Sequence, residues 1–366
     1  MKYGRIFNFS AGPAVMPEPV LETLRDEMLN YKGTGMSVME MSHRSKPYDA
    51  IIAHAEQKVR DLLKVPATHS VLFLQGGATH QFAMAPYNFY TDGHPIDFIH
   101  TGAWTEKAIK EAKRVAKCNV VATSEDKNFT YIPDYSHAKF NPDACYVHIC
   151  TNNTIFGTKY NNGFPNTGKV PMIADMSSEI LSRPIDVSKF HLIYAGAQKN
   201  LGPSGVCLAI INKDWAENTA RKDIAEFWSY RAHIKEGSRL NTPAAFGIYA
   251  VGQVLDWVEK QGGPEKLQKL NQEKAAILYN AIDSSGGFYD CPVQKEWRSD
   301  MNIVWRVKKD EALEDKFVKE AQAKGLDGLK GHRSVGGIRA SIYNAFPIEG
   351  VKALVDFMKE FQKKNG

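Results

Sequence analysis

Seven short apolar runs between Val71 and Asn212 constrain the fold of this chain more than any other feature. Helix-like segments such as QFAMAPYNFY and TEKAIKEAKRVAK separate the first of them. Apolar runs without polar alternation are typical of strands buried on both faces, as in parallel sheets covered by helices. The pattern therefore predicts an α/β fold with a mainly parallel, seven-stranded type of sheet flanked by helices. The seven runs are VLFL, DFIH, VVAT, CYVHIC, PMIAD, FHLIYA and GVCLAII.

The chain changes character after Asn241. TPAAFGIYAVGQVLDWVEK predicts a helix with Thr242 as its cap and Pro243 in its first turn, and PEKLQKLNQEKAAILYNAI predicts a second helix. Two strand-like runs, MNIVWRV and GIRASIY, follow beside further helical patterns. Because 366 residues suffice for two domains, we expect a large domain over residues 1–262 and a smaller α+β domain over residues 263–366.

Composition limits the classes of function. The 46 basic and 41 acidic residues give a net charge of +5, without a basic block, so we expect a small anionic ligand and no nucleic acid. The five cysteines show neither CxxC pairs nor His/Cys ligand spacing, which indicates a metal-free protein of the reducing cytoplasm. No apolar run reaches the roughly 18 residues of a membrane span.

A turn of small residues follows the first apolar run. Gly76, Gly77, Ala78 and Thr79 lie between a predicted strand and a predicted helix, where backbone N–H groups can hold a phosphate. The turn matches neither GxGxxG nor GxxxxGK[ST], which disfavours dinucleotides and nucleoside triphosphates. A purely structural turn explains these residues equally well.

Three further strand ends carry candidate residues, and ligands of parallel sheets gather at such ends. Trp104 offers a flat face for a planar ring, although tryptophan is more often a core residue. Asn153 and Thr154 are polar groups that could also be ordinary loop residues. Asp175 directly follows the run MIA, where an unpaired carboxylate is costly, so it either caps the next helix or pairs with a buried cation.

Lys199 lies in the small-residue loop AGAQKNLGPSG after the sixth run. A lysine in a partly dry site loses affinity for its proton and becomes a nucleophile toward carbonyl groups. A phosphate cradle, an aromatic face, an acid for a ring nitrogen and a lysine for an aldehyde are together what pyridoxal phosphate requires. Their order at successive strand ends predicts a pyridoxal phosphate site.

Histidine–arginine pairs occur in two loops. MSHRSKPY contains His43 and Arg44, and GHRSVGGIRASIYNA contains His332, Arg333 and also Arg339. Guanidinium groups match carboxylates and phosphates in two-point geometry. The pairs therefore predict a substrate with two anionic ends.

With these motifs the chain resembles the phosphoserine aminotransferase family, which belongs to class V of the fold-type I pyridoxal phosphate enzymes. The resemblance covers essentially the whole length. It rests on long segments: NFSAGPAVMPEPVLE, MEMSHRSKPY, FLQGGATHQFAM, TGAW, NNTIFGT, IADMSSE, AGAQKNLGPSG, LNTPAAFGIY and GHRSVGGIRASIYNAFPIEGV.

The resemblance implies a role for each candidate residue in holding the cofactor. Lys199 would be the Schiff-base residue, Asp175 would bind the pyridine nitrogen, and Trp104 would stack on the ring. Thr154 would lie near the ring hydroxyl. The phosphate would be held by Ala78, Thr79 and Gln198, and by Asn241 and Thr242 of the neighbouring subunit of a homodimer with shared active sites.

The resemblance also implies substrate contacts and a reaction. Arg44 would hold a substrate carboxylate, and the substrate phosphate would be bound by His43, His332 and Arg333, with Ser10 and Arg339 as further contributors. The expected reaction is reversible amino transfer between glutamate and 3-phosphohydroxypyruvate, which gives 2-oxoglutarate and O-phospho-L-serine for serine biosynthesis. Some relatives also act on 4-phosphohydroxythreonine in pyridoxine biosynthesis.

Two other functions compete with this one. Another class V enzyme, such as an alanine–glyoxylate aminotransferase or a cysteine desulfurase, would use the same cofactor site. A desulfurase needs a reactive cysteine on a late loop, yet the last cysteine is Cys291, and the paired HR motifs favour a phosphorylated substrate over alanine. A non-catalytic pyridoxal phosphate-binding protein is the alternative from a different class.

Overall fold

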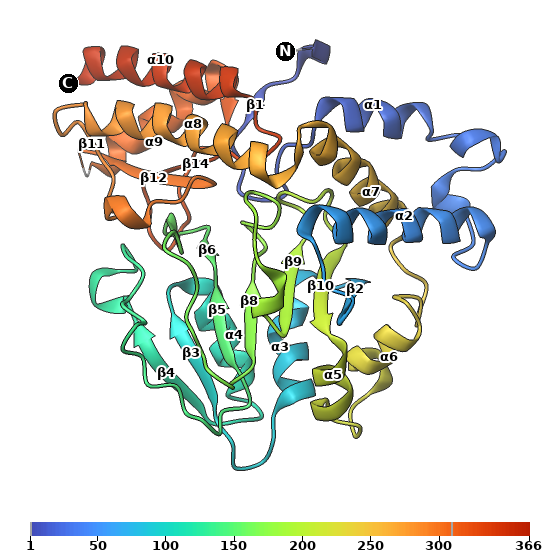
Figure 1. Cartoon of the computed structure of the whole chain (residues 1–366). Helices are drawn as coiled ribbons and strands as arrows, with labels where there is room; N and C mark the ends of the chain where they lie inside the picture. Colours follow the sequence, from blue (N-terminus) through green and yellow to red (C-terminus); the bar gives the residue numbers. More distant parts are fainter. Residues whose placement is uncertain (1, 309) are drawn as a thin grey trace.

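The centre of the molecule is one large sheet, as seen in the computed structural model, which describes residues 2–308 and 310–366 (Figure 1). The strand order is β2-β10-β9-β8-β5-β3-β4. Strand β10 runs antiparallel to both of its neighbours, β2 and β9, and the other pairings in this sheet are parallel. Each predicted run forms one strand, so the mainly parallel sheet is confirmed. The strands are β2 His69–Leu74, β3 Ile96–His100, β4 Cys118–Thr123, β5 Val147–Cys150, β8 Met172–Asp175, β9 Leu192–Gly196 and β10 Cys207–Asn212.

Helices cover both faces of this sheet. Successive strand residues point to opposite faces, so Phe73 packs in a cluster with α2 and α7 while Leu72 packs with α3 and α4. All residues of β3, β5, β8 and β9 are buried, which explains why most of their residues are apolar. The helices of this part are α1 Glu18–Asp26, α2 Lys46–Leu63, α3 Gly77–Phe89, α4 Ala103–Ala112, α5 Lys213–Thr219, α6 Tyr230–Lys235 and α7 Ala245–Lys260.

The helix after Asn241 begins later than predicted. Ala244 precedes the first residue of α7, and no side chain caps the helix. The Thr242 carbonyl instead accepts a hydrogen bond of 3.0 Å from Gln75 Nε2. Pro243 and Ala244 both lie outside the helix, so Thr242 is too far from the first turn to cap it. The prediction that Thr242 caps this helix is therefore wrong.

The C-terminal part forms a second layer. A three-stranded antiparallel sheet packs against α8, α9 and α10 through a buried cluster that includes Trp305, Phe317 and Leu354. The elements are α8 Gly263–Asp283, β11 Tyr289–Asp290, β12 Asn302–Val307, α9 Glu311–Ala323, β14 Ile338–Ser341 and α10 Ile348–Asn365.

The N-terminal segment lies against these C-terminal elements (Figure 1). Strand β1 Phe7–Asn8 pairs in parallel with β13 Leu326–Asp327, and Phe9 belongs to the same buried cluster as Trp305. The domain boundary between residues 262 and 263 stays a prediction. A short hairpin, β6 Asn152–Asn153 and β7 Thr158–Lys159, lies beyond the end of β5. None of the helices within residues 2–308 and 310–366 has the length and apolar character needed to cross a bilayer.

Candidate active site

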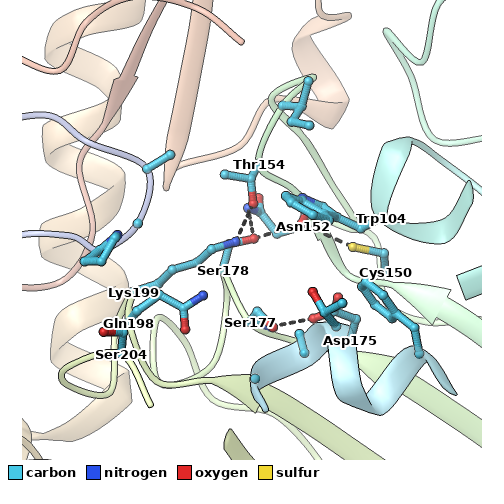
Figure 2. A pocket seen from close by; sticks show the side chains of 18 of the residues that line it. Trp104, Cys150, Asn152, Thr154, Asp175, Ser177, Ser178, Gln198, Lys199 and Ser204 are labelled. Atoms are coloured by element: carbon cyan, nitrogen blue, oxygen red, sulfur yellow. Dashed lines mark hydrogen bonds between the residues drawn. The ribbon is translucent and has the colours of Figure 1, made fainter. Parts of the chain in front are cut away.

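A cavity of about 560 Å³ lies at the carboxyl ends of the parallel strands (Figure 2). The segments that follow β2, β3, β5, β8 and β9 each supply residues to its wall, as expected for a ligand site on such a sheet. The structure thus brings together most of the residues predicted from the sequence. Those that line the cavity are Ala78, Thr79, Trp104, Thr154, Asp175, Gln198, Lys199, His332 and Arg339.

Lys199 extends from the loop after β9 toward the hairpin that follows β5 (Figure 2). Its Nζ donates a hydrogen bond of 2.7 Å to Thr154 Oγ1 and lies 5.6 Å from the centroid of the Trp104 ring. Burial lowers the pKa of Lys199 to about 8, although nearby Asp175 acts in the opposite direction. A lysine with this pKa is partly neutral near pH 7, so it can act as a nucleophile or as a base.

Asp175 ends β8 on the cavity floor, and its side chain is almost fully buried. Its Oδ1 accepts a hydrogen bond of 2.9 Å from the Ser177 N–H, and the Ser177 hydroxyl accepts one of 3.1 Å from the Gly196 N–H. Burial raises the pKa of Asp175, while the Ser177 hydrogen bonds and Lys199 oppose that shift. A carboxyl group held in this way is suited to a positively charged or N–H-bearing group in the cavity.

The turn between β2 and α3 has the backbone expected of an anion cradle. Gly76 and Gly77 have φ values of +82° and +62°, which favour glycine, and a Cβ on Gly76 would lie 2.6 Å from the His80 Cβ. Ala78 and Thr79 lie in the first turn of α3. The N–H groups of a first turn lack partners within the helix, and the helix dipole favours an anion there.

Asn241 and Thr242 lie outside the cavity of their own chain but close to the turn between β2 and α3. The Asn241 Nδ2 is 3.3 Å from Gln75 Oε1, and Gln75 Nε2 donates to the Thr242 carbonyl. Gln75 directly precedes Gly76. The two predicted residues therefore approach the turn through Gln75 and do not line the cavity.

Four other predicted residues also lie outside this cavity. His43 and Arg44 precede α2, and Arg44 is exposed. Ser10 is the neighbour of Ala11, which does line the cavity. Arg333 lines a second cavity of about 1140 Å³, which shares Ile155, His332 and Arg339 with the first.

The sequence reasoning assigned no role to two contributors. Asn152 lines the cavity, and its Nδ2 donates to Ser178 Oγ and to Asn302 Oδ1, each at 2.8 Å. The N-terminal loop contributes Gly12, where an added Cβ would lie 3.4 Å from Gln198 Cγ and 3.5 Å from Lys199 Cγ. The only signals were the first asparagine of NNT and the small residues of NFSAGP, and neither shows which distant segment it meets.

The cavity residues fit pyridoxal phosphate. Asp175 can bind a ring nitrogen, the first turn of α3 can bind a phosphate, and Lys199 can reach an aldehyde carbon. Trp104 supplies an aromatic face, and its buried Nε1 has no hydrogen-bond partner among the described residues. The four groups converge on one cavity from four different strand ends.

Comparison with known proteins gives a consistent result. The family model described as aminotransferase class-V matches residues 6–354. A phosphoserine aminotransferase from Chromobacterium violaceum is 51% identical over 362 residues, which cover 99% of both chains. The solved phosphoserine aminotransferase of Bacillus circulans subsp. alkalophilus is 48% identical, with a TM-score of 0.97 and 99% coverage of both chains. A phosphoserine aminotransferase from Trichomonas vaginalis, solved with PLP bound, is 40% identical, with a TM-score of 0.92, and 97% of this chain and 100% of that one are covered.

Proposed function

The chain belongs to the class-V aminotransferases, and we propose that it is a pyridoxal phosphate-dependent phosphoserine aminotransferase. The reaction is reversible amino transfer between L-glutamate and 3-phosphohydroxypyruvate, with 2-oxoglutarate and O-phospho-L-serine as products in serine biosynthesis. The observation that carries the proposal is the continuity of two cavities, because Lys199 lies in the first, and the second is lined by Arg333 and Arg339, which have no ion-pair partner among the described residues.

The residues of the first cavity hold the cofactor in this proposal. Asp175 keeps a proton on the ring nitrogen, and Trp104 covers the ring. Thr154 lies near the ring hydroxyl, and Ala78, Thr79 and Gln198 surround the phosphate. When bound, pyridoxal phosphate supplies an aldehyde that takes up the substrate amine and a ring that accepts electrons.

Lys199 carries the proton in this proposal. With the cofactor bound, the Lys199 amine would take the proton from the substrate α-carbon and would deliver it to the C4′ carbon of the cofactor, and it would do the reverse in the other direction. A pKa of about 8 suits both directions near neutral pH. Since both half-reactions reuse one site, the kinetics should be ping-pong.

Arg339 and the His332–Arg333 pair bind the two anionic ends of the substrate in this proposal. Arg339 reaches both cavities, and its buried Nε has no hydrogen-bond partner among the described residues. That geometry favours Arg339 for the substrate carboxylate, the role that the resemblance gave to Arg44. His332 and Arg333 would then take the phosphate.

We also propose a homodimer with shared active sites. His43 and Arg44 lie outside the cavities of their own chain, and in this proposal they complete the substrate site of a second copy. Leu29, which is 86% exposed, and Met39, which is 61% exposed, lie on the same N-terminal segment, and their burial would favour association. Mixing inactive Lys199→Ala and Arg44→Ala proteins should restore about a quarter of the activity, since half of the dimers would be hybrids with one intact site. No recovery in demonstrably hybrid dimers would contradict shared sites.

A cytoplasmic location and activity on 4-phosphohydroxythreonine in pyridoxine biosynthesis are further proposals. All five cysteines are free thiols, which supports a reducing compartment. The second substrate would use the same phosphate-binding residues.

The amino-donor preference tests the function. We expect O-phospho-L-serine to support amino transfer to 2-oxoglutarate at least about 100-fold better than L-serine or L-alanine, as measured by kcat/KM, because the phosphate contacts are lost without it. Equal values for phosphoserine and alanine would support an alanine–glyoxylate type of enzyme instead. A protein that binds the cofactor but transfers no amino group would be a binding protein.

A further inference from the structure

One cation beside the active site has no role in the function proposed above. Lys107 lies three residues after Trp104 in α4, and its Nζ is 4.6 Å from the centroid of the Trp104 ring. We propose that Lys107 is a further substrate-binding residue that favours substrates whose distal group is a phosphate dianion over those with a carboxylate. This inference rests on the proposed phosphoserine aminotransferase function and deepens it.

The position of Lys107 connects the two cavities. It lines the second cavity together with His332, Arg333 and Arg339. The Trp104 ring beneath its ammonium group also lies within 5.6 Å of the Lys199 Nζ and lines the first cavity. An anion held by Lys107 would therefore lie next to the first cavity, in which the substrate α-carbon reacts.

The charges on the second cavity leave room for a multiply charged anion. Arg306 is neutralised by Glu314, with 2.5 Å between Nε and Oε1. Within residues 2–308 and 310–366, Lys107, Arg333 and Arg339 have no carboxylate within ion-pair distance. Glu106 also lines this cavity, and no ion pair among the described residues joins it to those three cations.

The substrate charges match this set of cations. Phosphoserine carries one carboxylate and a phosphate of about −1.5 to −2 near neutral pH, whereas glutamate carries two single-charged carboxylates. With Arg339 on the shared α-carboxylate, a monoanionic distal group needs one cation, and a phosphate can use two. With Arg339 on the α-carboxylate and Arg333 on the distal group, Lys107 is the third cation. A distal carboxylate leaves its charge unbalanced, whereas a distal phosphate dianion balances it.

His332 lies close to the same three cations, and its neutral ring can donate a hydrogen bond. Burial lowers the pKa of His332 most, and Arg339, Arg333 and Lys107 lower it further. Its Nδ1 accepts a hydrogen bond of 3.3 Å from the Ser334 N–H, so a neutral ring carries its proton on Nε2. An imidazole N–H and a lysine ammonium on one cavity wall are suited to different oxygens of the same phosphate.

The test compares Lys107→Gln with Lys110→Gln. Lys110 is exposed, lies one turn further along α4 and lines neither cavity, so it controls for loss of a helix charge. We expect Lys107→Gln to raise the KM for O-phospho-L-serine about tenfold, with less than about a twofold change in the KM for glutamate. Lys107→Arg should keep the wild-type ratio, and Lys110→Gln should change neither constant.

A binding measurement provides a second readout that needs no turnover. The holoenzyme is first reduced with borohydride, so that the cofactor phosphate site stays filled, and inorganic phosphate is then titrated by calorimetry. The Kd for phosphate should rise about tenfold in Lys107→Gln and stay unchanged in Lys110→Gln.

Three results would overturn the inference. These are unchanged phosphate binding in Lys107→Gln, equal KM increases for both amino donors, and an altered cofactor absorbance without a KM change, which would indicate an effect through Trp104 alone. A wild-type enzyme that does not use phosphoserine would instead refute the proposed function, and the phosphate titration would still decide the role of Lys107.

Discussion

The Nζ of Lys199 and the Oγ1 of Thr154 lie 2.7 Å apart, and this hydrogen bond joins the loop after β9 to the hairpin after β5. Lys199 is the donor, and the Thr154 hydroxyl accepts. The bond holds the amine toward the Trp104 side of the cavity, and it favours the protonated form of the lysine, because a charge-assisted bond is stronger than a neutral one.

Replacement of Thr154 by valine tests this relationship. Burial lowers the pKa of Lys199 to about 8, and the hydrogen bond to Thr154 stabilises the charged form. Loss of the acceptor should therefore lower this pKa further. The rate of pyridoxal phosphate binding by the apoprotein is measured as a function of pH. The midpoint of this pH profile should lie at a lower pH in the valine variant than in the wild type. Thr154→Ser keeps the hydroxyl and should keep the midpoint. An unchanged midpoint in the valine variant would show that the bond does not influence the amine.

The buried lysine should also lower the stability of the apoprotein in a pH-dependent way. The folded pKa of about 8 lies below the ordinary lysine pKa of 10.5, so the folded protein binds fewer protons than the unfolded chain between these pH values, and stability rises with pH across that window. Below pH 8 the full cost applies, on the order of 3 kcal/mol.

Lys199→Met removes that cost. Urea unfolding of the apoproteins should show the variant more stable than the wild type at pH 7, with a difference that shrinks toward pH 10. The exposed Lys189→Met serves as the control and should show no such trend. A difference that is constant with pH would mean that Lys199 titrates alike in both states.

Asp175→Asn tests the acid at the cavity floor. The amide has nearly the same shape, but it cannot hold a proton on a ring nitrogen by charge, so we expect kcat to fall at least about 100-fold while the cofactor remains bound. Absorbance of the bound cofactor and stopped-flow half-reactions provide the readout. Asp186→Asn, an exposed carboxylate outside the cavity, should leave kcat unchanged. Full activity in the Asp175 variant would remove this carboxylate from the mechanism.

Gly157→Ala tests the contact between the hairpin and the C-terminal sheet. Gly157 has a φ of +74°, and an added Cβ would lie 2.9 Å from Val304 Cγ2 and 3.0 Å from the Asn302 carbonyl oxygen. We expect a loss of about 2–4 kcal/mol in the free energy of unfolding. Gly163→Ala, with φ +93° and open space around the Cβ, should cost only about 1 kcal/mol. Equal losses would mean that the backbone angle alone decides the effect.

The sheet could be predicted well because strands that are buried on both faces consist mostly of apolar residues, and such runs are visible in the sequence. Strands β8 and β9 consist mostly of apolar residues, and their ends placed Asp175 and Lys199 at one edge of the sheet. The start of α7 was missed because the Thr242 carbonyl bonds to Gln75, which lies 167 positions earlier in the chain. No local pattern contains that information.

The same limit explains which site residues were found. Trp104, Asp175 and Lys199 each follow an apolar run, so their positions could be predicted. Asn152 contacts Asn302 across 150 positions, and Gly12 packs beside Lys199 because β1 is anchored to β13. Lys107 belongs to a helical segment with several other lysines, and the fold places its ammonium over Trp104.

The most direct test of the account is the site of covalent cofactor attachment. The purified holoenzyme is reduced with borohydride and digested, and the peptides are analysed by mass spectrometry. We predict that the phosphopyridoxyl group is found on Lys199 in the AGAQKNLGPSG loop, and that Lys199→Ala protein carries none. Attachment to another lysine, or an active Lys199→Ala enzyme, would contradict the account.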